Sequence, residues 1–137
     1  FGGWSLYFAG GRPSYAYNYF GMDLYTVCGG AALVPGRHEI RLEFDYDGGG
    51  LGKGGTAVLL VDGEKHASER VERTIAYYFS FDETLDVGVD LGTPVTDDYP
   101  VLDNEFTGTI HTVRIDLDEP RHSAFDGGLP RRVMGAQ

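Results

Sequence analysis

The sequence predicts an all-β fold, an antiparallel β-sandwich, from three observations. Apolar and polar residues alternate in short runs, which is the periodicity of half-buried strands. Glycine accounts for 21 of the 137 residues, well above its usual share, and therefore predicts many tight turns. No window carries the apolar stripe of an amphipathic helix. Many short strands joined by turns are typical of antiparallel sandwiches.

The first strands are expected at residues 4–8 and 14–19, joined across residues 10–13. The next, 38–46, alternates throughout and places Ile40, Leu42, Phe44 and Tyr46 on one face, so this strand is half-buried. Residues 56–61 form a continuous apolar run that should lie deeper. Because both central positions tolerate positive φ, Asp62-Gly63 predicts a type I′ turn into a strand at 64–71.

Two further strands are expected towards the end of the chain. Residues 74–81 are rich in aromatic side chains, and residues 106–117 alternate Val113, Ile115 and Leu117 with Thr112, Arg114 and Asp116. The sandwich domain is therefore expected over residues 1–117. Residues 118–137 are expected to be an irregular tail, because proline and glycine interrupt them at Pro120, Gly127, Gly128, Pro130 and Gly135.

Charge and composition narrow the classes of partner. The net charge of −10 argues against nucleic acid and anionic membranes as partners. No apolar run approaches the ~18 residues of a transmembrane helix. Cys28 is the single cysteine, which excludes an internal disulfide and a cysteine-rich metal site, and we expect it at a strand end. The chain opens within a strand-like run without an initiator methionine, so we expect a fragment of a larger protein.

A glycine-rich segment at residues 47–55 is the most unusual in the chain. It fails the phosphate-loop pattern, because Asp47 replaces the first glycine, Gly54 follows Lys53, and a strand comes next. The dinucleotide-type glycine spacing at 50–55 has no helix after it. We expect a wide hairpin loop that links two core strands. The functional alternative is a flexible loop that packs against another domain or offers carbonyl groups to a cation. The contact residues would be Gly48, Gly49, Gly50, Leu51, Gly52 and Lys53.

Carboxylates gather in two places. Glu43, Asp45 and Asp47 alternate on one strand face, at a spacing near that of the paired carboxylates of retaining glycosidases, as in laminarinase-like enzymes. A solvated strand face is the simpler explanation of these carboxylates. Residues 82–105 carry eight carboxylates and neither lysine nor arginine, which favours either a solvated acidic rim or a Ca²⁺ site. The candidate metal ligands are Asp90, Asp97 and Asp98.

Aromatic residues near the start suggest a different ligand. Trp4, Tyr17 and Tyr19 could form a stacking platform for a glycan, or they could belong to the core.

Taken in order, seven motifs resemble the C-terminal part of bacterial arylsulfatases. They are GGWSLY at 2–7, YNYFG at 17–21, FDYDGGGLGKGG at 44–55, VDG at 61–63, RVERT at 70–74, DETLDVG at 82–88 and GTPVTDDY at 92–99. The resemblance covers residues 2–117, and the glycine-rich and acidic segments are its specific parts. It implies a jelly-roll sandwich, concanavalin A- or laminin-G-like, that follows a sulfatase catalytic domain.

That catalytic domain would carry Cys/Ser-x-Pro-x-Arg, whose first residue becomes formylglycine beside a Ca²⁺ or Mg²⁺ ion. Here Cys28 is followed by Gly29, Gly30, Ala31 and Ala32, so the motif is absent and no catalytic residue carries over. The resemblance therefore implies a non-catalytic accessory domain of a sulfuric ester hydrolase, packed on the catalytic domain in cis. The alternatives are a lectin-like carbohydrate-binding module and, third, a laminarinase-like glycosidase.

Overall fold

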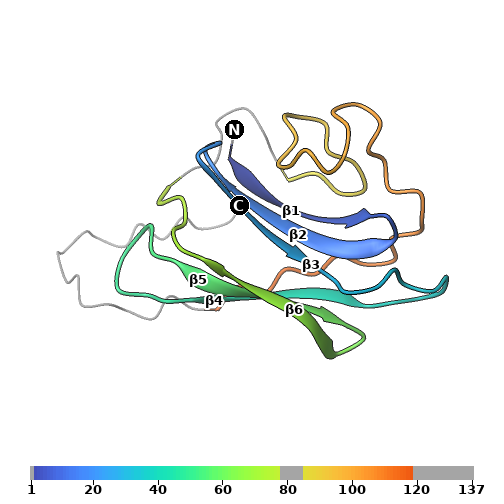
Figure 1. Cartoon of the computed structure of the whole chain (residues 1–137), viewed down its shortest axis with the longest axis horizontal. Coiled ribbons are helices and arrows are strands. Elements are labelled where there is room, and N and C mark those ends of the chain that lie inside the picture. Colours follow the sequence, from blue (N-terminus) through green and yellow to red (C-terminus); the bar gives the residue numbers. More distant parts are fainter. Residues whose placement is uncertain (1, 78–84, 119–137) are drawn as a thin grey trace, which may run out of the picture.

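A computed structural model describes residues 2–77 and 85–118, which form two three-stranded antiparallel sheets and contain no helix (Figure 1). The prediction of an all-β sandwich is confirmed. The strands of the described residues are β1 (Gly3–Ala9), β2 (Arg12–Tyr19), β3 (Asp23–Cys28), β4 (Ile40–Tyr46), β5 (Gly55–Val61) and β6 (Glu64–Val71). Nothing in these residues is a helix of the length and hydrophobicity needed to cross a membrane.

Each sheet is built from consecutive hairpins, in the orders β1-β2-β3 and β4-β5-β6. In the first sheet, Tyr15 of β2 lies opposite Leu6 of β1 and Val27 of β3. In the second, Leu59 of β5 lies opposite Leu42 of β4 and Ala67 of β6, and a register shift follows at Leu60. Because directly opposed residues share a face, these cross-strand rows define the inner face of each sheet.

The core forms where the inner faces of the two sheets meet. Its buried members are Tyr15, Tyr17 and Val27 from the first sheet, and Ala57, Leu59 and Val71 from the second. The sheets approach most closely at β3, which lies against β6 and β5. The edge strands β1 and β4 are less completely covered. On the inner face of β1, Trp4, Leu6 and Phe8 keep about two fifths of their surface exposed, at 41%, 40% and 38%.

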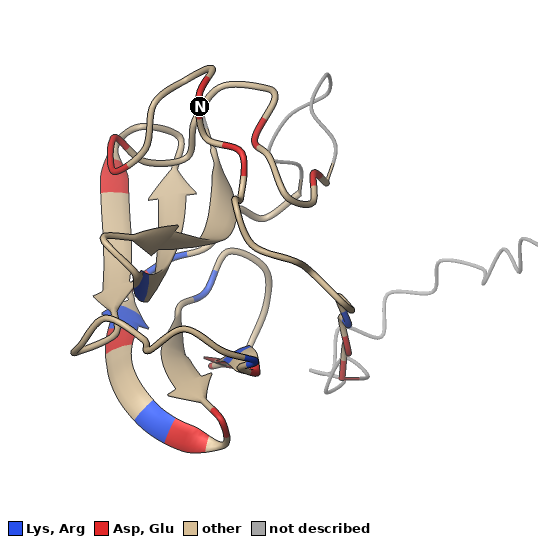
Figure 2. Cartoon of the chain, turned by 90° about the vertical axis from the view of Figure 1, so that its right-hand side faces the viewer, with Lys and Arg blue, Asp and Glu red and all other residues tan. Residues whose placement is uncertain are grey.

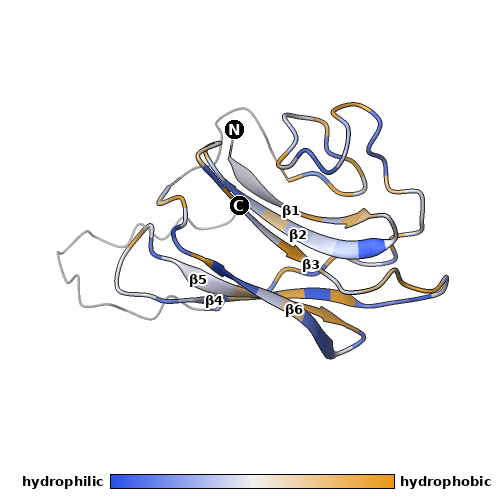
Figure 3. Ribbon diagram, in the orientation of Figure 1, coloured by the Kyte–Doolittle hydropathy of each residue, from blue (hydrophilic) through white to orange (hydrophobic). Residues whose placement is uncertain are grey.

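The outer face of the first sheet is covered by the first part of the 85–118 segment, whose yellow and orange coils lie over β1 in Figure 1. Asn18 donates a hydrogen bond from Nδ2 to the carbonyl oxygen of Val95 over 2.9 Å, and the rings of Tyr7 and Tyr99 meet edge to face at 5.2 Å. Hydrophilic and hydrophobic residues alternate along this covering coil (Figure 3). Segments without regular structure therefore complete the shielding of β1 and β2.

The predicted strand at residues 106–117 is wrong for this chain. Residues 109–118 are exposed and belong to no strand. An alternating pattern favours an extended backbone, but a strand also needs a neighbour to receive its hydrogen bonds. The predicted strand at 74–81 is not observed over residues 74–77, and residues 78–81 lie outside the described residues, as does the expected tail beyond residue 118.

Three hairpin turns have positive φ at both central residues, and the first of them, Gly10-Gly11 between β1 and β2, has φ values of 58° and 74°. Asp62 and Gly63 adopt φ values of 51° and 83°, which confirms the predicted type I′ turn. The second turn, Phe20-Gly21, leads into β3, and neither this turn nor β3 was predicted. Asn18 accepts a hydrogen bond from the Gly21 amide over 2.7 Å, which supports a conformation that phenylalanine rarely adopts. Cys28 is the last residue of β3, as expected at a strand end, and it is exposed.

The core predicts a difference between two leucines. Replacing Leu59, which is fully buried, with alanine should reduce the free energy of unfolding by about 2–5 kcal/mol, because the methyl groups leave a cavity between the sheets. The same replacement at Leu51, which is 66% exposed, should change it by no more than about 0.5 kcal/mol. Urea unfolding of both variants measures the difference, and equal effects would contradict this assignment of the core.

Candidate functional site

The loop between β4 and β5 is closed by contacts within itself. The Asp47 amide donates to the carbonyl oxygen of Gly54 over 3.0 Å, which continues the β4–β5 pairing beyond the strands. The Tyr46 hydroxyl donates to the carbonyl oxygen of Gly50 and accepts from the Lys53 amide at 3.0 Å. A single side chain at the end of β4 therefore holds both arms of the loop.

Four glycines of this loop have positive φ, with values of 75°, 78°, 129° and 70° at Gly48, Gly49, Gly50 and Gly52. Side chains other than glycine are strained in these conformations, so the turn depends on this composition. At the end of the loop, a Cβ on Gly54 would collide with the Val71 carbonyl oxygen and lie 2.6 Å from that of Glu72. The loop thus closes directly onto the backbone that follows β6.

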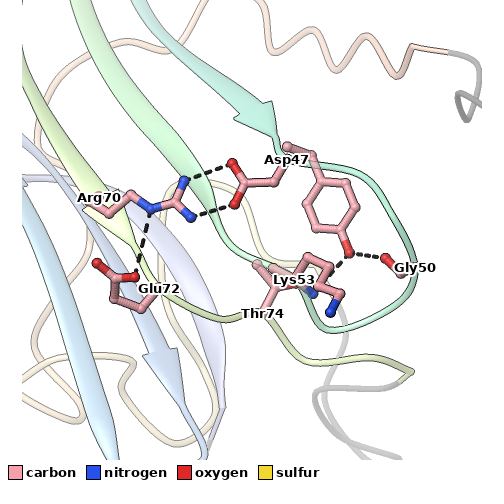
Figure 4. A network of polar contacts seen from close by, with 7 residues as sticks. Asp47, Gly50, Lys53, Arg70, Glu72 and Thr74 are labelled. Atoms are coloured by element: carbon pink, nitrogen blue, oxygen red, sulfur yellow. Dashed lines mark hydrogen bonds and ion pairs between the residues drawn. The ribbon is translucent and has the colours of Figure 1, made fainter.

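Side chains from β6 and from the segment after it also hold the loop (Figure 4). The Arg70 guanidinium donates two hydrogen bonds to the Asp47 carboxylate, one of them over 2.7 Å, and contacts Glu72 at 3.8 Å. The hydrogen bonds and positive charge of Arg70 lower the pKa of Asp47 below its ordinary value. Thr74 donates from Oγ1 to the Lys53 carbonyl oxygen over 2.7 Å. These contacts fix the loop against β6 on one side.

On its other side the loop presents an apolar group beside a cation. The Leu51 side chain is 66% exposed, and Lys53 is exposed next to it in the turn. The carbonyl groups of Gly50 and Lys53 accept hydrogen bonds from Tyr46 and Thr74. Two of the loop carbonyl groups that could face a cation therefore already have partners in the chain. The turn therefore displays the Leu51 and Lys53 side chains to solvent from a fixed backbone.

The acidic segment uses two of the three candidate metal ligands as acceptors for tyrosine. Asp90 accepts a hydrogen bond from the Tyr99 hydroxyl over 2.7 Å, and Asp98 accepts one from the Tyr7 hydroxyl. Asp97 is exposed. The described ranges contain no group of three or more histidine, cysteine, aspartate or glutamate side chains placed to hold a metal. In Figure 2 the acidic residues of the upper coils have no basic residue among them.

The three candidate stacking residues lie in different environments. Trp4 is 41% exposed on the inner face of edge strand β1. Tyr17 is only 5% exposed within the core, and its hydroxyl accepts a hydrogen bond from the Ile75 amide over 2.8 Å. The guanidinium of Arg73 lies 4.2 Å from the centre of the Tyr19 ring. Only Trp4 of the three therefore presents an open ring, and they do not form one platform.

The alternating carboxylates occupy two kinds of position. Glu43 and Asp45 are exposed on β4, and Glu43 accepts a hydrogen bond from Arg41 over 3.3 Å. Asp47 lies beyond the end of the strand, bound to Arg70. A general acid must hold a proton near neutral pH, and the lowered pKa of Asp47 opposes that role.

Sequence reasoning missed the residues that hold the loop, namely Tyr46, Arg70 and Thr74. Tyr46 was assigned to the apolar face of its strand, although a hydroxyl at a strand end beside a glycine-rich turn is a signal for capping of that turn. The sequence carries no signal for Arg70 or Thr74, because their contacts depend on how β6 pairs with β5.

Comparison with protein-family models, with curated proteins and with solved structures finds no match for this chain.

The tyrosine–aspartate pairs predict a loss of stability in alkali. Burial, together with the hydrogen bond to Asp90, raises the pKa of Tyr99 from 10.0 to about 12. The folded state therefore holds this phenolic proton more tightly than the unfolded state. The resulting stabilisation is complete below pH 10 and is lost between pH 10 and about 12.

Urea midpoints measured from pH 9 to 12 test this expectation. They should fall less steeply with pH for Tyr99→Phe, which has no proton to lose, and for Asp90→Asn, which lacks the negative charge beside the phenol. Slopes equal to that of the unaltered protein would show that Tyr99 does not contribute.

Proposed function

We propose that this chain is a non-catalytic accessory β-sandwich of an arylsulfatase-type sulfuric ester hydrolase, packed on the catalytic domain through the β4–β5 loop. The observation that carries the proposal is the loop itself. A turn built from glycines at positive φ is held by Tyr46, Arg70 and Thr74, and it displays an exposed leucine and lysine. Its sequence is also one of the two most specific parts of the resemblance to arylsulfatases.

A fixed loop is favourable for an interdomain contact because little conformational entropy remains to be lost on docking. The Leu51 side chain would enter an apolar depression of the catalytic domain, and Lys53 would pair with a carboxylate at the rim. The chain would shape the approach to the catalytic pocket and supply no reacting group. Formylglycine and its Ca²⁺ or Mg²⁺ ion would belong to the partner domain alone.

The carbohydrate-binding alternative has less support. A glycan platform needs several open rings, and of the three candidates Tyr17 is in the core and Tyr19 lies against Arg73. The glycosidase alternative loses its third carboxylate to Arg70. No specific contact or distance in the described residues favours either the carbohydrate-binding or the glycosidase alternative.

Reading the coding sequence upstream of Phe1 tests the proposal most directly. We expect a Cys/Ser-x-Pro-x-Arg motif in the same frame, because the accessory role requires a sulfatase domain before this chain. An unrelated domain, or a start codon next to Phe1, would refute the link to sulfatases.

A variant at the loop tests the contact in the full-length enzyme. Leu51→Ser should lower kcat/KM for a chromogenic aryl sulfate about fivefold, the effect of losing a contact worth about 1 kcal/mol. The thermal midpoint of the 137-residue chain should stay unchanged, because Leu51 is exposed. Val34→Ser, at a residue 72% exposed in another loop, is the matched control and should retain full activity. Glycine replacements are unsuitable here, because alanine would strain the turn.

Unchanged kcat/KM of the Leu51→Ser enzyme would show that the β4–β5 loop does not make the interdomain contact, whatever the upstream sequence contains.

A further inference from the structure

Residues 110–117 have the sequence of a strand, but no sheet within the described residues includes them. Every residue of this segment is exposed, including its four apolar members at Ile110, Val113, Ile115 and Leu117. Arg114 contacts Asp116 at 2.8 Å, two residues along, as side chains on one face of an extended backbone do. Figure 2 shows the described chain leaving the two sheets at this end. Within the described residues the segment therefore has the pattern of a strand but no ladder.

The edge strand β4 offers a place for such a segment. It pairs with β5 on one side, and its other side has no strand among the described residues. Ile40, Leu42 and Phe44 on its inner face are only half-buried, although they pack against the core. Its outer face carries Arg41, paired with Glu39 and Glu43. An open edge with a partly exposed apolar row is a template for a further strand.

The two sequences fit in one antiparallel register. With Arg114 opposite Glu43, Asp116 falls opposite Arg41, so both outer pairs have opposite charges. On the inner face the same register places Val113, Ile115 and Leu117 opposite Phe44, Leu42 and Ile40. In a parallel arrangement with the same Arg114–Glu43 pair, Asp116 would face Asp45 instead. Charge and hydrophobicity thus select the same antiparallel alignment.

The geometry of the chain opposes this pairing within one molecule. Phe106 packs on Phe8 with ring centres 5.6 Å apart, close to the end of β1. In Figure 1, β1 ends on the side of the molecule at which the chain enters β4. The antiparallel register requires Thr112 at the far end of β4, opposite Asp45. Six residues reach at most about 20 Å, close to the length of β4, so none remain for turning back.

We propose that residues 110–117 add as a strand to the free edge of β4 in a second copy of this chain. Two copies related by a two-fold axis would exchange equivalent segments, which closes the assembly as a dimer. Each sheet β4-β5-β6 would gain a fourth strand, and the apolar side chains of the segment would cover Ile40, Leu42 and Phe44. The inference is independent of the proposed accessory role.

Sedimentation of the 137-residue chain from micromolar to millimolar concentration tests the dimer. Arg114→Glu and Glu43→Arg each place like charges opposite each other at both contacts, so each should raise the dissociation constant roughly tenfold. In an equimolar mixture of the two variants, both contacts regain opposite charges. The mixture should therefore dimerise as tightly as the unaltered chain. Lys65→Glu, an equal change of charge at an exposed position of β6, should have no such effect.

Three outcomes would overturn the proposal. The first is a monomer at all concentrations up to millimolar. The second is a dimer whose dissociation constant is unaffected by either charge reversal. The third is that the dissociation constant returns to that of the unaltered chain when both reversals are in one chain, but not when the two single variants are mixed. That result would show that the segment pairs with β4 of its own molecule.

Discussion

The packing of the inner faces of the two sheets against each other organises the rest of the molecule. It gathers Tyr15, Tyr17 and Val27 of the first sheet with Ala57, Leu59 and Val71 of the second into one core, and it removes these side chains almost completely from water. Burial of this kind is the principal favourable term in folding. The central strands β2 and β5 are each hydrogen-bonded to a neighbour on both sides. The packing of the two sheets therefore also positions all four edge strands.

The position of each edge strand follows from this central contact. β3 and β6 are drawn together, whereas β1 and β4 keep partly exposed inner rows. On its outer face β1 is covered by an irregular segment, held by Asn18 and by the Tyr7–Tyr99 ring contact. β4 has no comparable cover in the described residues. The chain thus covers β1 with one of its own segments, whereas the edge of β4 is open to a further strand in the described part of the chain.

Pairing of β6 with β5 also determines the form of the glycine-rich loop. It places Arg70 beside Asp47 and carries Thr74 to the carbonyl group of Lys53. Exposed ion pairs of this type contribute little to global stability. Their effect is local, because they restrict a turn whose glycines would otherwise allow many conformations. The exposed Leu51 is therefore presented in a defined position.

The sequence by itself determined the strands whose signals are local. The strand predicted at 64–71 agrees with β6 in both bounds, and Asp62-Gly63 forms the predicted turn, because alternation and positive φ depend on neighbouring residues only. The short strand β3 was missed, since Phe20-Gly21 is an unusual type I′ pair. The glycine-rich loop was predicted as a loop, but not the side chains that hold it.

Only the tertiary structure decided which extended segments became strands and which aromatic residues became core. Residues 112–117 alternate as regularly as β4 does, but a ladder requires an edge within reach. Phe106 holds the segment near the start of β4, whereas the antiparallel register needs Thr112 at its other end. Tyr17 and Trp4 face each other across β1 and β2, yet one is buried and the other open, because the second sheet covers β2 and not β1. Local sequence encodes the direction of a side chain, whereas its burial depends on what the rest of the chain places in front of it.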